Sequence, residues 1–222
     1  MNRRQILWSF LLWIIATLLS IFFLDRPIAA FAQSAGGRDS VLLQQGTTWL
    51  EVASGFPIDR NLVTYLLAGA ALLLFISKST RPVAWMILFV ATTHVVTRLT
   101  AGTLKNVFHR LRPFEVIQAG NWDWKFFGEH GSSFPSGHAA HFWGLFFPIA
   151  FLFPRYRFVF AILPVFISIA RVGVNDHWFS DVIASVSIAS VITLLFIWIF
   201  RMQQTTGEVR QKPKPMREVA NE

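Results

Sequence analysis

The sequence has 222 residues, of which 54% are hydrophobic and 14% are charged, and it contains no cysteine. This composition excludes an ordinary soluble domain and indicates a membrane protein, while the lack of cysteine excludes disulfides and thiolate metal sites. The formal net charge of +8 is compatible with nucleic-acid binding, but the distribution of the charges argues against that partner.

Six apolar segments predict an all-α fold, an integral membrane bundle of about six transmembrane helices. Residues 6–24 and 182–200 are each 19 residues long without a charged side chain, close to the roughly 20 residues that a helix needs to cross a bilayer. The shorter segments between them become long enough when polar residues at one end are sheltered inside the bundle. In chain order these segments are 62–76, 82–97, 139–153 and 158–170.

The N-terminal segment has an alternative interpretation as a cleaved signal peptide. The triplet Ala30-Phe31-Ala32 resembles a signal-peptidase site that follows a charged start and an apolar stretch. However, the apolar run is longer than the roughly 7–15 residues of a signal core, and Asp25 and Arg26 interrupt the segment. We therefore expect a retained membrane helix, with cleavage as the alternative.

The basic residues indicate how the bundle is oriented. Six spans place both termini on one side of the membrane, and that side carries eleven basic residues against three acids, which accounts for the whole net charge of +8. Such an excess marks the cytoplasmic side. We therefore expect a multi-pass protein of the cytoplasmic (inner) membrane with both termini in the cytoplasm. The basic residues on that side are Arg3, Arg4, Lys78, Arg81, Arg155, Arg157, Arg201, Arg210, Lys212, Lys214 and Arg217.

The chain is expected to form one membrane domain, residues 1–202, followed by a polar, disordered cytoplasmic tail, residues 203–222. Two long loops, 25–61 and 104–135, fall on the periplasmic or extracellular side. Polar motifs gather at that side between residues 105 and 181. A functional site is therefore expected on the outer face.

The first motif is KNVFHRLRP, residues 105–113. Lys105 and Arg112 are seven residues apart and Arg98 lies seven residues earlier, so a continuous helix would present these cations on one face. Pro113 would end that helix. The cations either snorkel to the membrane interface as structural residues or form part of an anion site.

The second motif is PSGH, Pro135 to His138, at the start of an apolar segment. A helix start offers free N–H groups and a dipole that favour an anion. Ser136 adds a hydroxyl, Gly137 lets the backbone approach a ligand closely, and His138 adds a proton donor. The alternative is an ordinary N-cap followed by a structural histidine.

The third motif is ARVGVNDHWFSD, residues 170–181. His177 and Asp181 are four residues apart and would be neighbours on a helix face. A carboxylate beside an imidazole fixes its tautomer and leaves the other ring nitrogen free as a nucleophile. Arg171 is costly to place in an apolar bundle without an anionic partner. The alternative is a buried structural Arg–Asp or His–Asp pair.

Together the three motifs favour one site for an anion with several oxygens over three unrelated structural explanations. Cations, a helix start, two histidines and an aspartate converge on the same side of one bundle. Arginine presents a planar fork that fits phosphate, and lysine adds a point charge. Two histidines allow one to attack while the other protonates the leaving oxygen.

These residues resemble the type-2 phosphatidic acid phosphatase superfamily, which is related to vanadium haloperoxidases. The family signature reads K-x6-R-P, then P-S-G-H, then S-R-x5-H-x3-D. In one departure, Ala170 stands where the family usually has serine, which removes an accessory hydroxyl near the phosphate. The matching positions are Lys105, Arg112, Pro113, Pro135, Ser136, Gly137, His138, Arg171, His177 and Asp181.

The resemblance implies a six-helix membrane core with the site at one membrane face, and it implies a mechanism. His177 would attack phosphorus and form a phosphohistidine, Asp181 would orient His177, and His138 would protonate the leaving group and then activate water. No metal and no other cofactor is implied, because cations of the protein take that role. The implied phosphate-binding residues are Lys105, Arg112, Ser136, Gly137 and Arg171.

The leading hypothesis is a lipid phosphatase at the outer face of the cytoplasmic membrane, with the bilayer and a lipid phosphate as its partners. The family suggests undecaprenyl diphosphate, lipid A, phosphatidylglycerophosphate or phosphatidic acid, and an outward-facing site slightly favours the first two. The alternatives are a phosphatase of a water-soluble ester and a non-catalytic phospholipid-binding or transport protein. A vanadate-dependent haloperoxidase is a further alternative, but those relatives are soluble, and the six-span pattern argues against it.

Overall fold

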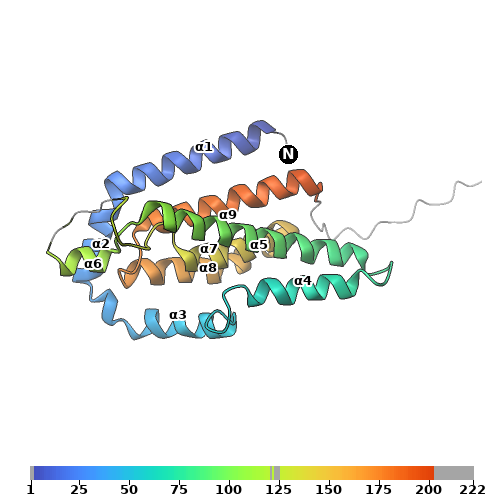
Figure 1. Ribbon diagram of the computed structural model, residues 1–222, viewed down its shortest axis with the longest axis horizontal. Coiled ribbons are helices and arrows are strands. Elements are labelled where there is room, and N and C mark those ends of the chain that lie inside the picture. The colour runs from blue at the N-terminus through green and yellow to red at the C-terminus, as the bar shows by residue number, and fades with distance from the viewer. Residues whose placement is uncertain (1–2, 121, 123–125, 203–222) are drawn as a thin grey trace, which may run out of the picture.

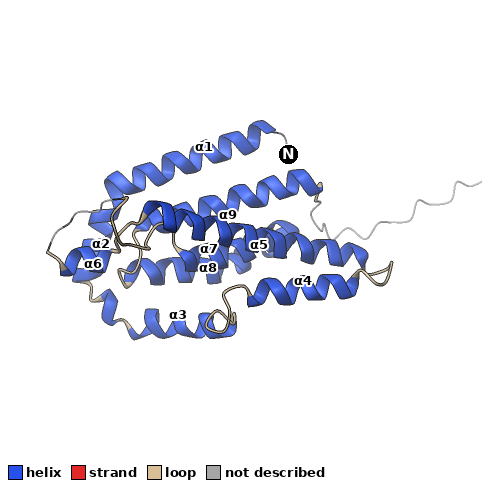
Figure 2. Cartoon of the chain, in the orientation of Figure 1, coloured by secondary structure: helices blue, strands red, loops and turns tan. Residues whose placement is uncertain are grey.

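The protein is a bundle of helices in the computed structural model, which describes residues 3–120, 122 and 126–202 (Figure 1). The predicted tail, residues 203–222, lies outside the described residues. The described part of the chain contains helices and no strand (Figure 2), which confirms the all-α prediction. The helices are α1 (Arg3–Leu19), α2 (Asp25–Ser34), α3 (Val41–Ala53), α4 (Leu62–Leu74), α5 (Arg81–Phe108), α6 (Pro113–Gln118), α7 (Gly137–Leu152), α8 (Arg157–Gly173) and α9 (Phe179–Phe200), with a π-helical turn at Ser20–Leu24 and 3-10 turns at Gly37–Asp39 and Pro154–Tyr156.

The helices coincide with the apolar segments of the sequence. Within the described residues, four helical stretches are long and apolar enough to cross a membrane, namely Arg4–Ser34, Arg81–Gln118, Pro154–Gly173 and Phe179–Phe200. The other two predicted spans correspond to α4, with 13 residues, and α7, with 16 residues. Four candidate spans therefore support the membrane architecture, and the count of six stays a prediction.

Helix α7 is central to the bundle. It packs against α5, α8 and α9, while α4 packs against α5 and α1 packs against α9 (Figure 1). Small residues let the helices approach closely: Ala139 and Ala140 are fully buried, and a Cβ atom at Gly144 would lie 3.0 Å from Thr97 Cβ of α5. This packing fixes the first turn of α7, which contains the second motif.

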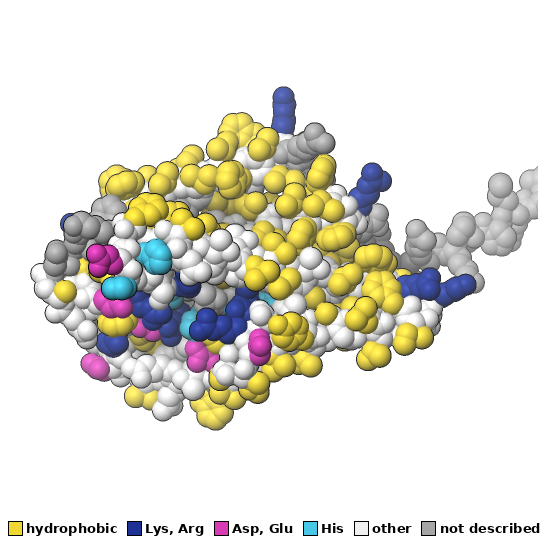
Figure 3. Space-filling model, viewed as in Figure 1, with side chains coloured by type: hydrophobic (Ala, Val, Ile, Leu, Met, Phe, Trp, Pro, Cys, Tyr) yellow, Lys and Arg dark blue, Asp and Glu magenta, His cyan; other side chains and the backbone are white. Residues whose placement is uncertain are grey.

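The outer surface of the bundle is apolar, as a bilayer requires. Between 65% and 74% of the surface is exposed in large apolar residues such as Trp8, Phe22, Leu73 and Phe158. Apolar side chains that are so exposed are more stable in contact with lipid than in contact with water. Figure 3 shows hydrophobic side chains over much of the visible face. Charged side chains gather toward the end where α2 and α6 lie (Figures 1 and 3).

The contact between Gly37 and α8 gives a stability prediction. A Cβ atom at Gly37 would lie 2.0 Å from the backbone oxygen of Gly173 and 2.9 Å from that of Ala32. Alanine would therefore push the 3-10 turn away from α8. We expect Gly37→Ala to reduce the free energy of unfolding by about 1–3 kcal/mol, measured as a lower melting temperature in detergent micelles.

Gly69→Ala in α4 is the matched control. A Cβ atom there meets no heavy atom within 4 Å, and alanine favours the helix more than glycine does. Its melting temperature should equal or slightly exceed that of the wild type. If Gly37→Ala melted at the wild-type temperature, the close contact with α8 would not constrain the fold.

Candidate active site

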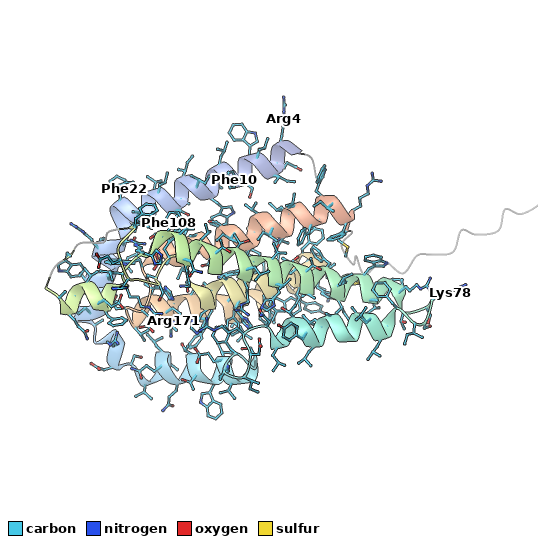
Figure 4. All side chains as sticks on the ribbon, in the orientation of Figure 1. Arg4, Phe10, Phe22, Lys78, Phe108 and Arg171 are labelled. Carbon is cyan, nitrogen blue, oxygen red and sulfur yellow. The ribbon has the colours of Figure 1, made fainter. Side chains whose placement is uncertain are left out.

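Three segments that are far apart in the sequence meet at one end of the bundle. They are the last turns of α5, the start of α7 and the loop between α8 and α9. The N–H of Ser136 donates to the backbone oxygen of Asp181 at 3.0 Å, and Lys105 Nζ donates to the backbone oxygen of Ser133 at 3.3 Å. Figure 4 places Arg171 at this end, where Figure 3 shows the charged side chains. The three predicted motifs therefore lie together.

Helix α5 ends inside the first motif, which corrects the prediction of one continuous helix. The helix stops at Phe108, and His109 adopts a left-handed conformation with φ of 39°. Arg112 precedes α6, and Pro113 is the first residue of that helix, where its missing N–H is not needed. The prediction that Lys105 and Arg112 share a helix face was therefore wrong.

A loop, rather than a helix face, brings the two family cations of the first motif together. Lys105 Nζ donates to the backbone oxygen of Ser132, and Arg112 Nη2 lies 3.4 Å from Ser132 Oγ. Both side chains thus reach the residues just before PSGH. Arg98, the third cation of the predicted face, donates instead to Asn61 Oδ1 at 2.8 Å.

The PSGH motif forms the start of α7. Ser136 is the N-cap, and its Oγ accepts from the N–H of Ala139 at 3.4 Å, so the N-cap interpretation is confirmed for this residue. A Cβ atom at Gly137 would lie 3.6 Å from Lys105 Cε, an ordinary contact distance. Packing therefore does not require glycine here. Its small size leaves the helix start open beside a lysine, which favours an anion.

His177 and Asp181 form the predicted pair, although only Asp181 belongs to α9. The helix begins at Phe179 after the N-cap Trp178, and His177 lies in the loop before it. His177 Nδ1 is 3.4 Å from Asp181 Oδ2, and the two side chains are 2% and 0% exposed. With Nδ1–H directed at the carboxylate, Nε2 carries the lone pair.

Burial keeps the ring of His177 neutral. It lowers the pKa of His177 to about 3, and the positive charges of Lys105 and Arg171 act in the same direction, against the hydrogen bond to Asp181. The imidazole is therefore unprotonated at physiological pH, which is the form that a nucleophile requires. Both cations lie close enough to His177 for their charges to affect its protonation.

A buried ion-pair network that the sequence analysis missed supports Asp181. Arg110 is fully buried and donates from Nη1 to Asp181 Oδ1 and from Nη2 to Asp25 Oδ2, both at 2.6 Å. Ser133 Oγ donates to Asp181 Oδ2 at 2.5 Å, and Ser180 Oγ donates to Asp25 Oδ2 at 2.6 Å. Both carboxylate oxygens of Asp181 are therefore bound, which fixes its orientation toward His177.

One signal for this network was present in the sequence. Asp25 follows directly on the first apolar run, and a charged side chain within a membrane segment needs a partner. The partner is 85 positions away, so no local spacing identifies it. The N-terminal segment thus supplies the partner of Arg110, and its retention stays a prediction.

Arg171, near the end of α8, has an acidic partner in the loop that follows. Its Nη2 lies 2.5 Å from Asp176 Oδ2, and the same carboxylate is 3.8 Å from Arg38 and 4.0 Å from Arg112. The predicted alternative of an Arg–Asp pair is thus present. However, the buried Nε of Arg171 has no hydrogen-bond partner among the described residues, so the guanidinium keeps a donor for a ligand oxygen.

His138 is held by a residue of α3. Its Nε2 forms a hydrogen bond with Glu51 Oε1, and this bond lowers the pKa of Glu51 below its usual value. Glu51 is therefore ionised at neutral pH and orients the imidazole. The ring of Phe56 packs on His138 with 4.9 Å between centroids. The segment 25–61, to which the sequence analysis assigned no role, thus contributes to the site.

The comparisons with known proteins agree with this geometry. A model of the PAP2 superfamily matches residues 82–205, more than half of the chain. A protein of Rhizobium etli named lipid A 1-phosphatase is 31% identical over 186 residues, which cover 81% of this chain and 78% of that protein. A protein of the same name from Rhizobium johnstonii is 31% identical over 191 residues, which cover 83% and 77%. No solved structure matches the chain.

The matched region contains every predicted site residue, from Lys105 to Asp181. The relatives hydrolyse phosphate, as their name states, and the site presents a neutral histidine beside several cations. The chain therefore belongs to the PAP2 superfamily and is a phosphatase.

Proposed function

We propose that the protein removes phosphate from a membrane lipid through a phosphohistidine intermediate and without a metal ion. The observation that carries this proposal is the neutral His177, held by Asp181 and lying near Lys105 and Arg171, at one end of a bundle with four candidate membrane spans in its described part. A nucleophile and fixed cations at a membrane boundary are what hydrolysis of a lipid phosphate requires.

In the first step, Nε2 of His177 forms a bond to phosphorus as the bond between phosphorus and the leaving oxygen breaks. His138 donates a proton to that oxygen. Asp181 stabilises the positive charge on the imidazole of His177. In the second step, His138 takes a proton from water, the water oxygen bonds to phosphorus, and the nitrogen–phosphorus bond breaks. Phosphate leaves and His177 is neutral again.

The cations hold the oxygens of the transferred phosphoryl group. Lys105, Arg112 and Arg171 supply three positive charges, and the unpartnered Nε of Arg171 supplies a further donor. The hydroxyl of Ser136 and the N–H of Gly137, at the start of α7, add neutral donors. Such preorganised donors stabilise the charge that develops in the transition state.

The site is proposed to lie at the outer face of the cytoplasmic membrane. Arg4 and Lys78 lie toward the end of the bundle opposite to Arg171 (Figure 4), and the excess of basic residues in the sequence segments predicted to share their side favours a cytoplasmic location for it. A lipid phosphate in the outer leaflet then reaches the site with its acyl chains still in the bilayer.

The names of the two relatives make the 1-phosphate of lipid A the first substrate to test. The purified wild type should release phosphate from one or more of lipid A, undecaprenyl diphosphate, phosphatidylglycerophosphate and phosphatidic acid in detergent micelles. Faster turnover of a water-soluble phosphate ester without micelles would replace the lipid substrate by a soluble one. Binding without turnover would indicate a transport or binding protein, and bromide oxidation with added vanadate would indicate a haloperoxidase.

Chelation tests the role given to the protein cations. Because Lys105, Arg112 and Arg171 supply the positive charge, we expect EDTA to leave the initial rate of phosphate release unchanged. Enzyme dialysed against EDTA should be compared with enzyme supplied with magnesium, manganese or zinc. A strict requirement for any of these ions would contradict the metal-free mechanism.

A further inference from the structure

Helix α3 carries a row of polar side chains along an open groove, and it exposes several apolar side chains on its other faces. Leu42, Trp49 and Val52 are 71%, 72% and 58% exposed. On another face, Gln44, Thr47, Thr48 and Glu51 recur at helical spacing and line a groove against α8. A helix at a membrane surface normally directs its polar face to water. In α3 the row lines the groove instead, with Thr47 buried and Gln44 and Thr48 exposed, so its polar groups are accessible to a ligand held there.

The groove has a volume of about 320 Å³, at the small end of the roughly 300–1,000 Å³ of small-molecule sites. One wall is α3, and the other wall includes Arg171 and Asp176 from the end of α8 and the loop that follows. Arg38, stacked on the ring of Phe114 with 4.1 Å between its Cζ atom and the ring centroid, also lines it. The groove therefore begins at the phosphate-binding arginine.

The groove also meets the residue that protonates the leaving group. Glu51 lines the groove and holds His138 Nε2. In the proposed mechanism His138 protonates the leaving oxygen through Nδ1, because its Nε2 is bound to Glu51, while phosphorus lies near Arg171 and His177. The leaving oxygen is then one imidazole ring away from Glu51, so the groove lined by Glu51 and Arg171 is next to the group attached to that oxygen.

The residues that line the groove indicate which kind of chemical group, attached to the leaving oxygen, can bind there. The groove carries two arginines, Arg38 and Arg171, and two carboxylates, Glu51 and Asp176, so its formal charge is balanced. An acyl chain would leave these polar groups without hydrogen-bond partners, and the balanced charge gives the groove no net attraction for a second phosphate. A group with several hydroxyls can donate to carboxylates and accept from arginine and amide groups.

We propose that the groove between α3 and α8 binds the sugar ring of a glycolipid whose phosphate is attached to that sugar. This inference rests on the proposed phosphatase function and adds a specificity site to it. The protein then prefers a sugar phosphate over a glycerol phosphate because the ring hydroxyls bind the polar face of α3. Gln44 and Thr48 act as specificity residues and take no part in the chemical steps.

The test is the ratio of kcat/KM for lipid A 1-phosphate to kcat/KM for phosphatidic acid, both in the same detergent micelles. The double variant Gln44→Met, Thr48→Val keeps the side-chain sizes and removes a hydroxyl and an amide, which also donates to the backbone oxygen of Arg38. Losing about two neutral hydrogen bonds should lower this ratio about tenfold, mainly through KM for the sugar lipid. Thr103→Val is the matched control, because Thr103 makes the same helix-internal bond, to Leu99 at 3.0 Å, as Thr48 makes to Gln44 at 3.1 Å. Its ratio should equal that of the wild type.

An unchanged ratio in the double variant, with a wild-type melting temperature, would overturn the sugar groove and leave the phosphatase function intact. So would a wild type that hydrolyses phosphatidic acid and not lipid A 1-phosphate. A wild type that hydrolyses no lipid phosphate would instead overturn the proposed function itself, and with it the proposal that the groove binds a sugar ring.

Discussion

Replacing His177 by alanine should abolish phosphate release. The proposed mechanism has one nucleophile, Nε2 of His177, and removing the nucleophile of a covalent mechanism lowers kcat by about 10⁴-fold or more. The ring is 2% exposed, so water cannot simply take its place against the phosphate without rearrangement. Phosphate release from the preferred lipid in detergent micelles, with wild type and variant at equal protein concentration, measures the loss.

The control for this experiment is His130→Ala. His130 lies in an exposed loop position, and neither motif nor geometry gives it a role, so its activity should match the wild type. Both variants should insert in membranes and melt near the wild-type temperature. Activity in His177→Ala within tenfold of the wild type would exclude His177 as the nucleophile.

The intermediate can be trapped through the second histidine. An aryl phosphate has a leaving group that departs without protonation, so His138→Ala should still form the phosphohistidine from it. The second step, which needs His138 as a base, should then be slow. We expect an acid-labile phosphate on His177 to accumulate in this variant, detected by peptide mass spectrometry. A stable label on serine or aspartate would contradict the mechanism.

The apolar segments and the three motifs could be predicted because their signals are local. Runs such as 182–200 are long and apolar enough to indicate a membrane helix, and the segment 158–170 agrees with α8 to within a few residues. The end of α5 could not be predicted in this way. His109 adopts φ of 39° although it is not a glycine. Pro113 predicts the end of a helix, but in the structure it is the first residue of α6.

The residues missed at the site are those that act across long sequence separations. Glu51 meets His138 across 87 positions, and Arg110 meets Asp25 across 85. No periodicity links such residues, and each is a single charged side chain among many. The polar face of α3 was visible in the sequence as Gln44, Thr48 and Glu51, but only the packing of α3 on α8 shows that this face lines a groove.

The second large effect is expected on the stability of the protein, from a substitution in the buried ion-pair network of Arg110, Asp25 and Asp181. Arg110→Met should lower the free energy of unfolding by about 3–5 kcal/mol, because it leaves Asp25 and Asp181 as buried carboxylates without their shared cation. Methionine fills similar volume, so the loss reports the charge rather than a cavity. Melting temperature and the yield of monodisperse protein from detergent measure it.

A second substitution separates the contribution of each carboxylate. Asp25→Asn removes one of the two negative charges while keeping an oxygen that can accept from Ser180. In the Arg110→Met background it should therefore recover part of the stability, whereas alone it leaves Arg110 paired only with Asp181 and destabilises. The two effects should not add, and the coupling energy from this double-mutant cycle should be at least about 1 kcal/mol. Strict additivity would mean that Arg110 and Asp25 do not act as a pair, and the N-terminal helix would then have no electrostatic link to Asp181.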